Sequence, residues 1–157
     1  MGLPGDILKE QVAPHGASGS DRPHWDDPKP VAFRWVPIRS LCERHRPRIL
    51  AHLLSLPAAD RYLRFGYSAS DAQVSHYTDL IDFANDEVFG IFNRRLELLA
   101  MAHLAMAAAR ADRGRSEAEF GVSVLPKARG RGYGSRLFAR AVLHARNRRI
   151  ELRLTDR

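Results

Sequence analysis

The apolar and polar positions along the chain fall into segments with two different periods. The large apolar residues Val31, Phe33 and Trp35 come at every second position of residues 31–36, which predicts a β-strand that Pro37 ends. Two apolar runs, at residues 86–92 and 96–104, lie on either side of a polar Asn-Arg-Arg break and predict a β-hairpin. The second run is rich in Leu, Ala and Met, which favour helix. It follows a turn and precedes another strand, so we interpret it as a strand.

Apolar residues at helical spacing predict the helices. The first covers residues 40–56, with Ser40 as its N-cap and Pro47 as a point where it breaks or restarts. A short helix or turn then closes near Gly66, and Ser70 caps a helix that continues towards residue 84. A last helix is expected over 135–149, with a buried face made of Leu137, Phe138, Ala141, Val142 and Ala145.

Two more strands complete the pattern, one over residues 119–125 and one that begins at residue 150. The predicted order is therefore β-α-α-β-β-β, a glycine-rich turn, and then α-β, which is an α/β (α+β) fold. A chain of 157 residues favours a single domain. Residues 1–30 contain few apolar side chains and predict a flexible tail, so we place the domain at residues 31–157.

Composition narrows the class of protein. The chain is 45% hydrophobic and 27% charged, as is typical of a soluble globular domain. Its single cysteine, Cys42, excludes a disulfide within the chain and a metal cluster built from cysteines. No segment has the pattern of a signal peptide or a membrane-spanning helix, so we expect a cytoplasmic protein without a membrane partner.

Positive charge is concentrated at the C-terminal end. Residues 127–157 contain ten Lys or Arg and two acidic residues, a net charge of +8, whereas the whole chain carries +7 and the other 126 residues therefore carry −1. Such a distribution favours an anionic partner near residue 127, either a phosphate-bearing cofactor or a nucleic acid. An arginine-rich helix face that is merely solvated is the alternative.

Three glycines, Gly130, Gly132 and Gly134, lie between the strand at 119–125 and the last helix. Glycine permits positive φ angles and lets a ligand approach the backbone, and the first turn of the helix presents N–H groups without acceptors. The turn is therefore a candidate site for a phosphate or pyrophosphate. The spacing is not that of a P-loop, and it fits a Rossmann turn poorly.

The spacing Arg129-x-x-Gly132-x-Gly134, between a strand and a helix, resembles the motif of the GNAT superfamily of acetyl-coenzyme A-dependent N-acetyltransferases. That resemblance implies a mixed, mostly antiparallel sheet flanked by helices. It also implies acetyl-coenzyme A as co-substrate, an amine as acceptor and no metal. Acetyl transfer in this family is direct attack of the amine on the thioester.

The resemblance further implies roles for individual residues. The backbone around Val122 and Val124 would pair with the pantetheine arm, and Glu119 would act as the general base. An alternative for Glu119 is a carboxylate that only balances nearby arginines. The pyrophosphate would be bound by the N–H groups of the turn, at Arg129, Gly130, Arg131, Gly132, Tyr133, Gly134, Ser135 and Arg136.

The chain departs from the family pattern near its end. Members of the family continue with a further helix and two more strands, and a later tyrosine often serves as general acid, whereas no tyrosine follows Tyr133 here. We therefore expect a partial domain, an impaired enzyme and an exposed sheet edge that could pair two copies into a homodimer. A non-catalytic coenzyme A-binding protein is the first alternative. A basic nucleic-acid-binding module is disfavoured, because the last helix has an apolar face to bury.

Other polar residues carry weaker signals. His76, His103 and His144 lack the spacing of metal ligands and are expected at the surface or in packing. Asp82 and Asp86 belong to an acidic cluster before the hairpin, which could attract a cationic amine or simply cap the preceding helix.

Overall fold

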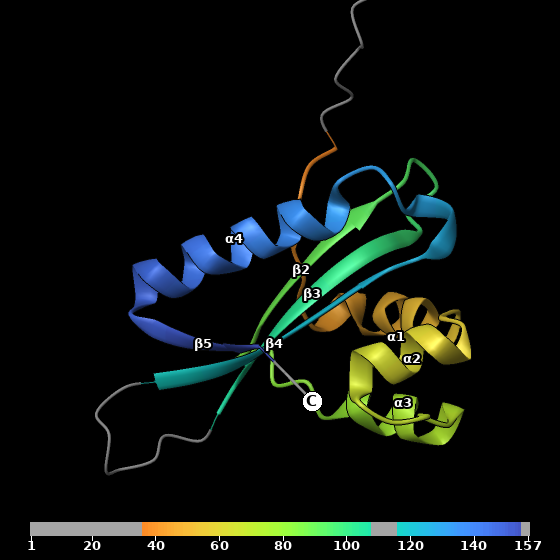
Figure 1. The fold of residues 1–157 in the computed structure, drawn as a ribbon, viewed down its shortest axis with the longest axis horizontal. Helices are drawn as coiled ribbons and strands as arrows, with labels where there is room; N and C mark the ends of the chain where they lie inside the picture. The colour runs from red at the N-terminus through yellow and green to blue at the C-terminus, as the bar shows by residue number, and fades with distance from the viewer. Residues whose placement is uncertain (1–35, 108–115, 155–157) are drawn as a thin grey trace, which may run out of the picture. The chain divides into compact units, whose positions relative to one another are not determined.

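The computed structural model describes residues 36–107 and 116–154. The chain divides into two compact units, residues 1–34 and 35–157, and the description that follows concerns the second. The predicted tail at 1–30 and most of the predicted strand at 31–36 lie outside the described residues. Within them, a five-stranded sheet carries helices on both faces (Figure 1).

The sheet has the strand order β1-β2-β3-β4-β5. Neighbouring strands are antiparallel, except that β4 and β5 are parallel. This confirms the mixed, mostly antiparallel sheet that the sequence resemblance implied. The strands are β1 (Arg39–Ser40), β2 (Glu87–Phe92), β3 (Leu98–Met106), β4 (Ser116–Val124) and β5 (Ile150–Leu154).

The predicted hairpin is confirmed as β2 and β3, which contain the best-buried residues of the sheet. Every residue of β3 from Leu98 to Leu104 is buried. The Leu- and Ala-rich composition of β3 favours helix locally, but a strand covered on both faces must be apolar along its whole length. Tertiary burial therefore decides the conformation of this segment.

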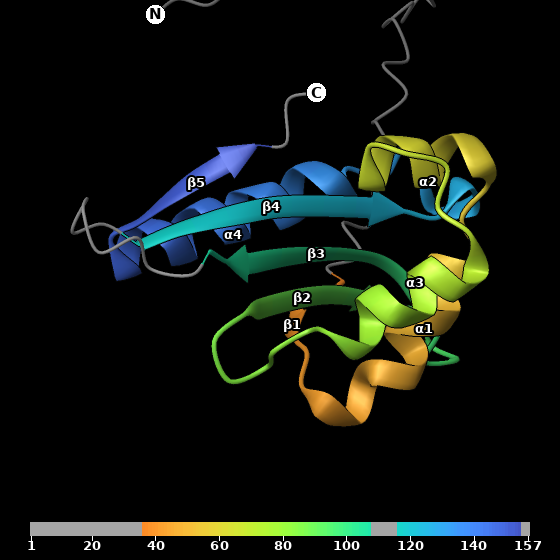
Figure 2. The same cartoon turned by 90° about the horizontal axis from the view of Figure 1, so that it is seen from below.

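Helices α1, α2 and α3 lie on one face of the sheet and α4 lies on the other, as the two views in Figures 1 and 2 show. Helix α1 contacts β3, α2 contacts β4, and α4 crosses β2, β3, β4 and β5. Short 3₁₀ turns cover Glu43–His45 and Pro126–Ala128. The helices are α1 (Arg46–Leu54), α2 (Ala58–Phe65), α3 (Asp71–Asp79) and α4 (Tyr133–Arg148).

The start of the described chain differs from the prediction. Arg39 and Ser40, after Pro37, form β1, so Ser40 belongs to a strand instead of capping a helix. The amide of Leu41 still donates to the carbonyl of Val88 at 2.7 Å, so ladder-type bonding continues past Ser40 and leaves it no freedom to cap. Cys42 precedes the 3₁₀ turn in its place.

Two predicted helix boundaries are confirmed. Gly66 ends α2 with a φ of 77°, a conformation that glycine adopts at little cost. The side chain of Ser70 accepts from the amide of Gln73 and begins α3. Helix α3 stops at Asp79, however, so Leu80 does not extend the apolar stripe and remains 67% exposed.

Helix α4 begins two residues earlier than predicted, at Tyr133, and buries Leu137, Ala141 and Ala145 against the sheet. Phe138 was expected to be buried but is 40% exposed, and its ring meets that of Phe120 at 5.4 Å. Phe138 therefore lies at the border of the area that α4 covers on the sheet. Arg149 ends α4 with a φ of 56°, and β5 starts at the next residue.

Candidate functional site

The glycine-rich turn forms the N-terminal end of α4. Gly130 and Gly132 both have φ angles of 74°, and the first bond of the helix runs from the amide of Arg136 to the carbonyl of Gly132 at 3.1 Å. The amides of the first helical turn therefore have no acceptor within the helix. No side chain caps this end, and no acidic residue lies in its first turn. These amides and the helix dipole together suit an anion.

There is room for a ligand against this turn. A Cβ atom added at Gly130 or Gly132 would meet nothing within 4 Å. At Gly134 an added Cβ would lie 3.7 Å from the side chain of Val124, so the first turn of α4 directly adjoins the end of β4. The turn and the strand form one continuous surface.

The arginines of the turn have different surroundings. Arg129 forms an ion pair with Asp60 of α2, and its amide donates to the carbonyl of Pro126 at 3.3 Å. Arg136 donates to the carbonyl of Val36 at 2.5 Å. Both side chains therefore fasten the turn to neighbouring segments, whereas Arg131 is exposed.

Hydrogen bonding on β4 leaves part of its other edge open. Leu125 donates to Leu99 at 2.9 Å, and Glu117 accepts from Ala107 at 2.8 Å. In an antiparallel ladder these directions alternate, so the backbone N–H and C=O of Val122 and Val124 point away from β3. Pairing with β5 extends only to the pair of Phe120 with Leu154, so beyond it Val122 and Val124 have no strand partner among the described residues.

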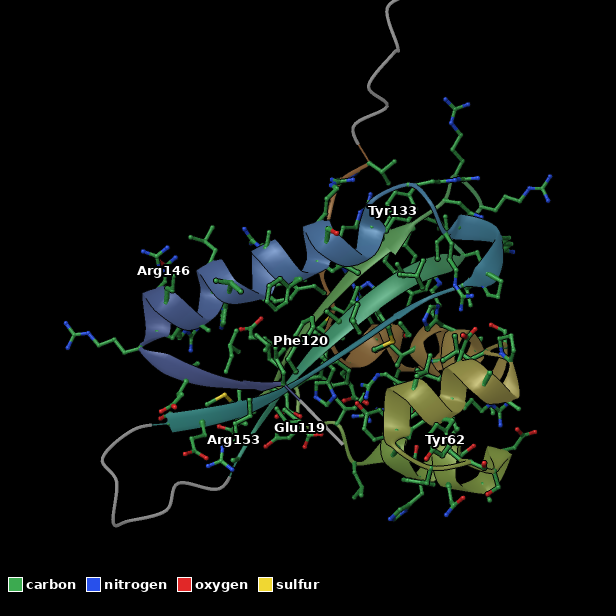
Figure 3. All side chains as sticks on the ribbon, viewed as in Figure 1. Tyr62, Glu119, Phe120, Tyr133, Arg146 and Arg153 are labelled. Carbon is green, nitrogen blue, oxygen red and sulfur yellow. The ribbon has the colours of Figure 1, made fainter. Side chains whose placement is uncertain are left out.

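The two faces of β4 differ in what covers them. Phe120 packs against Phe138 of α4, which places the even-numbered side chains on that face. Ser123 bonds to His52 of α1 at 2.8 Å, so odd-numbered side chains, including Glu119, lie on the face covered by α1, α2 and α3. Figure 3 shows Phe120 and Glu119 on opposite sides of the strand.

A chain of polar side chains crosses that second face, and the sequence did not reveal it. Arg64 of α2 donates to the hydroxyl of Tyr77 of α3 at 2.5 Å, and Tyr77 is hydrogen-bonded to Nδ1 of His103. Nε2 of His103 meets Asp86 at 2.9 Å. The other oxygen of Asp86 accepts from the amide of Met106 at 2.9 Å.

Burial determines the protonation of this chain. Burial is the largest effect that lowers the pKa of His103, although Asp86 opposes it, and burial likewise raises the pKa of Tyr77. Both side chains are therefore neutral near pH 7. The consistent arrangement has Nε2–H of His103 donating to Asp86 and Tyr77 donating to Nδ1.

A cleft of about 740 Å³ opens beside this chain. Tyr77, Asp86, His103 and Ala105 line it. Ala105 pairs directly with Glu119 across the β3–β4 ladder, so Glu119 lies on the same face of the sheet as this lining residue. Ser116 also lines the cleft, which therefore lies at the end of the sheet where β4 begins.

Among the described residues, no cluster of three or more His, Cys, Asp or Glu side chains could hold a metal ion. None of the helices described is long and apolar enough to span a membrane.

The sequence profile of the acetyltransferase (GNAT) family matches residues 56–156, which is more than half of the chain. The chain belongs to the GNAT family. No curated protein sequence matches it. The matched range includes the glycine turn, strands β4 and β5, and the polar side chains from Arg64 to His103.

Solved GNAT-like structures share the fold. An acetyltransferase from Clostridium acetobutylicum, solved with acetyl-CoA, has a TM-score of 0.59 and 14% identity, and the match covers 78% of this chain and 81% of that one. A Trypanosoma brucei acetyltransferase has a TM-score of 0.55 and 18% identity, over 78% and 84% of the two chains. The aminoglycoside N-acetyltransferase AAC(6')-Iy, in complex with CoA, has a TM-score of 0.56 and 16% identity, over 78% of each chain.

Proposed function

We propose that this GNAT protein transfers the acetyl group of acetyl-coenzyme A to the nitrogen of an amine. One observation carries the proposal: the uncapped end of α4 adjoins the open edge of β4 through the approach of Gly134 to Val124. An anion site next to unpaired strand groups suits a ligand with a pyrophosphate at one end and an amide-containing arm. The similarity to structures that contain acetyl-CoA or CoA supports this choice of ligand.

The residues that would hold the cofactor follow from the geometry. The amides from Gly130 to Ser135 would bind the pyrophosphate, and the exposed Arg131 would add positive charge. Because the amide of Arg129 already bonds to Pro126, Arg129 would contribute mainly by fastening the turn to α2. The edge of β4 at Val122 and Val124 would pair with the amides of the pantetheine arm. The bound cofactor supplies an activated acetyl thioester.

Glu119 is the residue that we propose as general base. It lies opposite Ala105, a residue that lines the cleft, and three residues before the open edge at Val122. Its carboxylate would accept the proton that the ammonium group of the acceptor must lose before the nitrogen can attack. A strand amide at the open edge would donate to the carbonyl oxygen on which negative charge develops.

Gly134 offers a sharp test of the cofactor site. The Gly134→Glu variant places a carboxylate at the anion site, and the geometry tolerates the new side chain because Gly134 lies within a helix and only a van der Waals contact with Val124 is added. An acidic residue in the first helical turn also favours the helix. The Gly134→Gln variant is the matched control, of equal size without charge.

Calorimetric titration with acetyl-coenzyme A is expected to show saturable binding by the wild-type protein. The Glu variant should bind roughly tenfold or more weakly than the Gln variant, since like charges a few ångströms apart repel by about 1–3 kcal/mol near a protein surface. Equal affinities of the two variants would contradict placement of the pyrophosphate at this turn. Binding without release of coenzyme A with any amine would favour the non-catalytic alternative.

The open side of β5 supports a second, independent proposal about assembly. Within the described residues β5 is an edge strand, and the alternation on β4 directs the amides of Ile150, Leu152 and Leu154 outward. Two copies could pair there as a homodimer. A sedimentation coefficient that keeps the value of a monomer up to high protein concentration would exclude this homodimer. The domain boundary at residue 31, the partial domain and the cytoplasmic location remain predictions.

A further inference from the structure

The guanidinium group of Arg64 lies directly against β4. A Cβ atom added at Gly121 would overlap Cζ and Nη1 of Arg64, so glycine at this position leaves room for the guanidinium where it now lies. Gly121 immediately precedes Val122, where the open edge of β4 begins. The charge of Arg64 is thereby held on the acceptor-facing side of the strand, beside the place proposed for acetyl transfer.

Neighbouring side chains fix the position of this cation. Its Cζ atom lies 5.2 Å from the ring centres of both Phe65 and Tyr77, and its Nη2 donates to the Tyr77 hydroxyl. Rings at these distances attract a cation and restrict its rotation. The polar chain from Tyr77 to Asp86 holds the tyrosine in turn. Arg64 is consequently preorganised rather than free to swing into solvent.

No carboxylate neutralises Arg64 within the described residues. It forms no ion pair there, although four other arginines do: Arg46, Arg61, Arg129 and Arg153. Its Nε is buried without a hydrogen-bond partner. A half-buried cation without an ion pair is unfavourable, and an anion bound at the guanidinium group would relieve it. The planar fork of a guanidinium fits a carboxylate through two parallel hydrogen bonds.

We propose that Arg64 binds a carboxylate of the acceptor, and that the acceptor is an amine with a carboxylate close to its nitrogen, as in an α-amino acid. This inference rests on the acetyl transfer proposed above. Glu119 and Gly121 project to the same face of β4, about 6.6 Å apart along the strand. A zwitterion placed between them would direct its ammonium group towards Glu119 and its carboxylate towards Arg64.

The test compares α-amino acids with their carboxamides in a coenzyme A-release assay with the full chain. An amide lowers the pKa of the neighbouring amine and so supplies more of the reactive free base. Chemistry alone therefore favours the carboxamide. If Arg64 binds the carboxylate, the wild-type protein should instead prefer the acid, by roughly 10- to 100-fold in kcat/KM, as expected for charge-assisted hydrogen bonds.

Three variants separate Arg64 from general effects. Arg64→Gln should abolish the preference by raising KM for the acid, with KM for the carboxamide little changed. Arg64→Lys keeps the charge without the fork and should retain part of the preference. Arg146→Gln is the matched control, because Arg146 is exposed near the far end of α4 (Figure 3), and it should leave the preference intact. Melting temperatures establish that each variant is folded.

The outcomes are distinct. Equal or better use of carboxamides by the wild-type protein would overturn the role of Arg64 while leaving acetyl transfer standing. So would a folded Arg64→Gln variant that keeps the preference, or a protein that binds acetyl-coenzyme A but acetylates no carboxylate-bearing amine. Failure to bind acetyl-coenzyme A at all would instead reject the proposed function on which the inference rests.

Discussion

Glu119 combines two properties at the scale of a single residue: it is a carboxylate on the cleft side of β4, and it lies close to the open strand edge. In the Glu119→Gln variant the shape of the side chain is retained but its basicity is lost. We expect kcat/KM for acetyl transfer to fall by roughly 100- to 10,000-fold, with little change in affinity for acetyl-coenzyme A. The deficit should shrink as pH rises, because more acceptor then arrives deprotonated.

Glu117 provides the control for this experiment. It is on the same face, two residues earlier, and its carboxylate pairs with Arg153 at 2.8 Å. The Glu117→Gln variant should retain activity near that of the wild-type protein. Comparable losses in both variants would indicate that Glu119 supports the strand rather than the chemistry, and would contradict its assignment as base.

Residues whose role depends on local backbone conformation could be recognised from sequence. Gly130, Gly132 and Gly134 lie between a strand and a helix, and the structure places two of them at positive φ and the third at the first turn of α4. Arg64, by contrast, contacts Tyr77 of α3 and Gly121 of β4, and no spacing in the sequence brings these residues together. One sign of the polar side chains around Arg64 was present in the sequence, because His103 is a polar residue in an otherwise apolar strand. Its interpretation as a surface or packing residue missed the hydrogen bonds to Tyr77 and Asp86.

At the scale of elements, His52 joins α1 to the centre of the sheet. Its Nδ1–H donates to the carbonyl of Leu98 at 2.8 Å, and its Nε2 accepts from the hydroxyl of Ser123 at 2.8 Å. Burial lowers the pKa of His52 to about 4. The folded protein therefore resists protonation of His52, whereas the unfolded chain takes up that proton near pH 6.5.

The sign of the resulting pH dependence follows from linkage. The contribution of His52 is fully present above pH 6.5 and is lost as the pH falls towards 4, and it amounts to about 3 kcal/mol. Urea unfolding at pH 7 and pH 5 should show a smaller loss of stability in His52→Gln than in the wild-type protein. His76→Gln, at an exposed histidine, should behave like wild type. If the free energy of unfolding of His52→Gln changed with pH as much as that of the wild-type protein, this account would be disproved.

Elements were predictable where local and tertiary preferences agree. The Ser70 cap, the Gly66 end of α2 and the hairpin all combine a suitable residue with a suitable apolar pattern. The position of β1 was not predictable, since its two residues are fixed by pairing with Phe89 and Gly90, about fifty positions along the chain. A strand of two residues is too short to show an apolar pattern that would predict its pairing with a distant strand.

At the scale of the whole molecule, charge is separated from the apolar core and concentrated after residue 127, with a net +8 over residues 127–157. Attraction of an anionic cofactor to such a region is screened by salt over about 8–10 Å. The Kd for acetyl-coenzyme A should therefore rise several-fold between low and high ionic strength. Arg131→Gln should flatten this dependence, and Arg146→Gln should flatten it less, because Arg146 lies at the opposite end of α4.

The joint between α4 and β5 has a mechanical consequence. Only Arg149 separates the two elements, so β5 must start where the last turn of α4 points, while the first turn of α4 abuts β4. The length of the helix thus fixes where β5 starts, at the pair of Ile150 with Ser116 of β4. Each added residue would rotate the departure of β5 by about 100° and advance it by 1.5 Å. The alignment of β5 with β4 therefore depends on the number of residues in α4. A single insertion in α4 would disturb this alignment more than many substitutions in the helix.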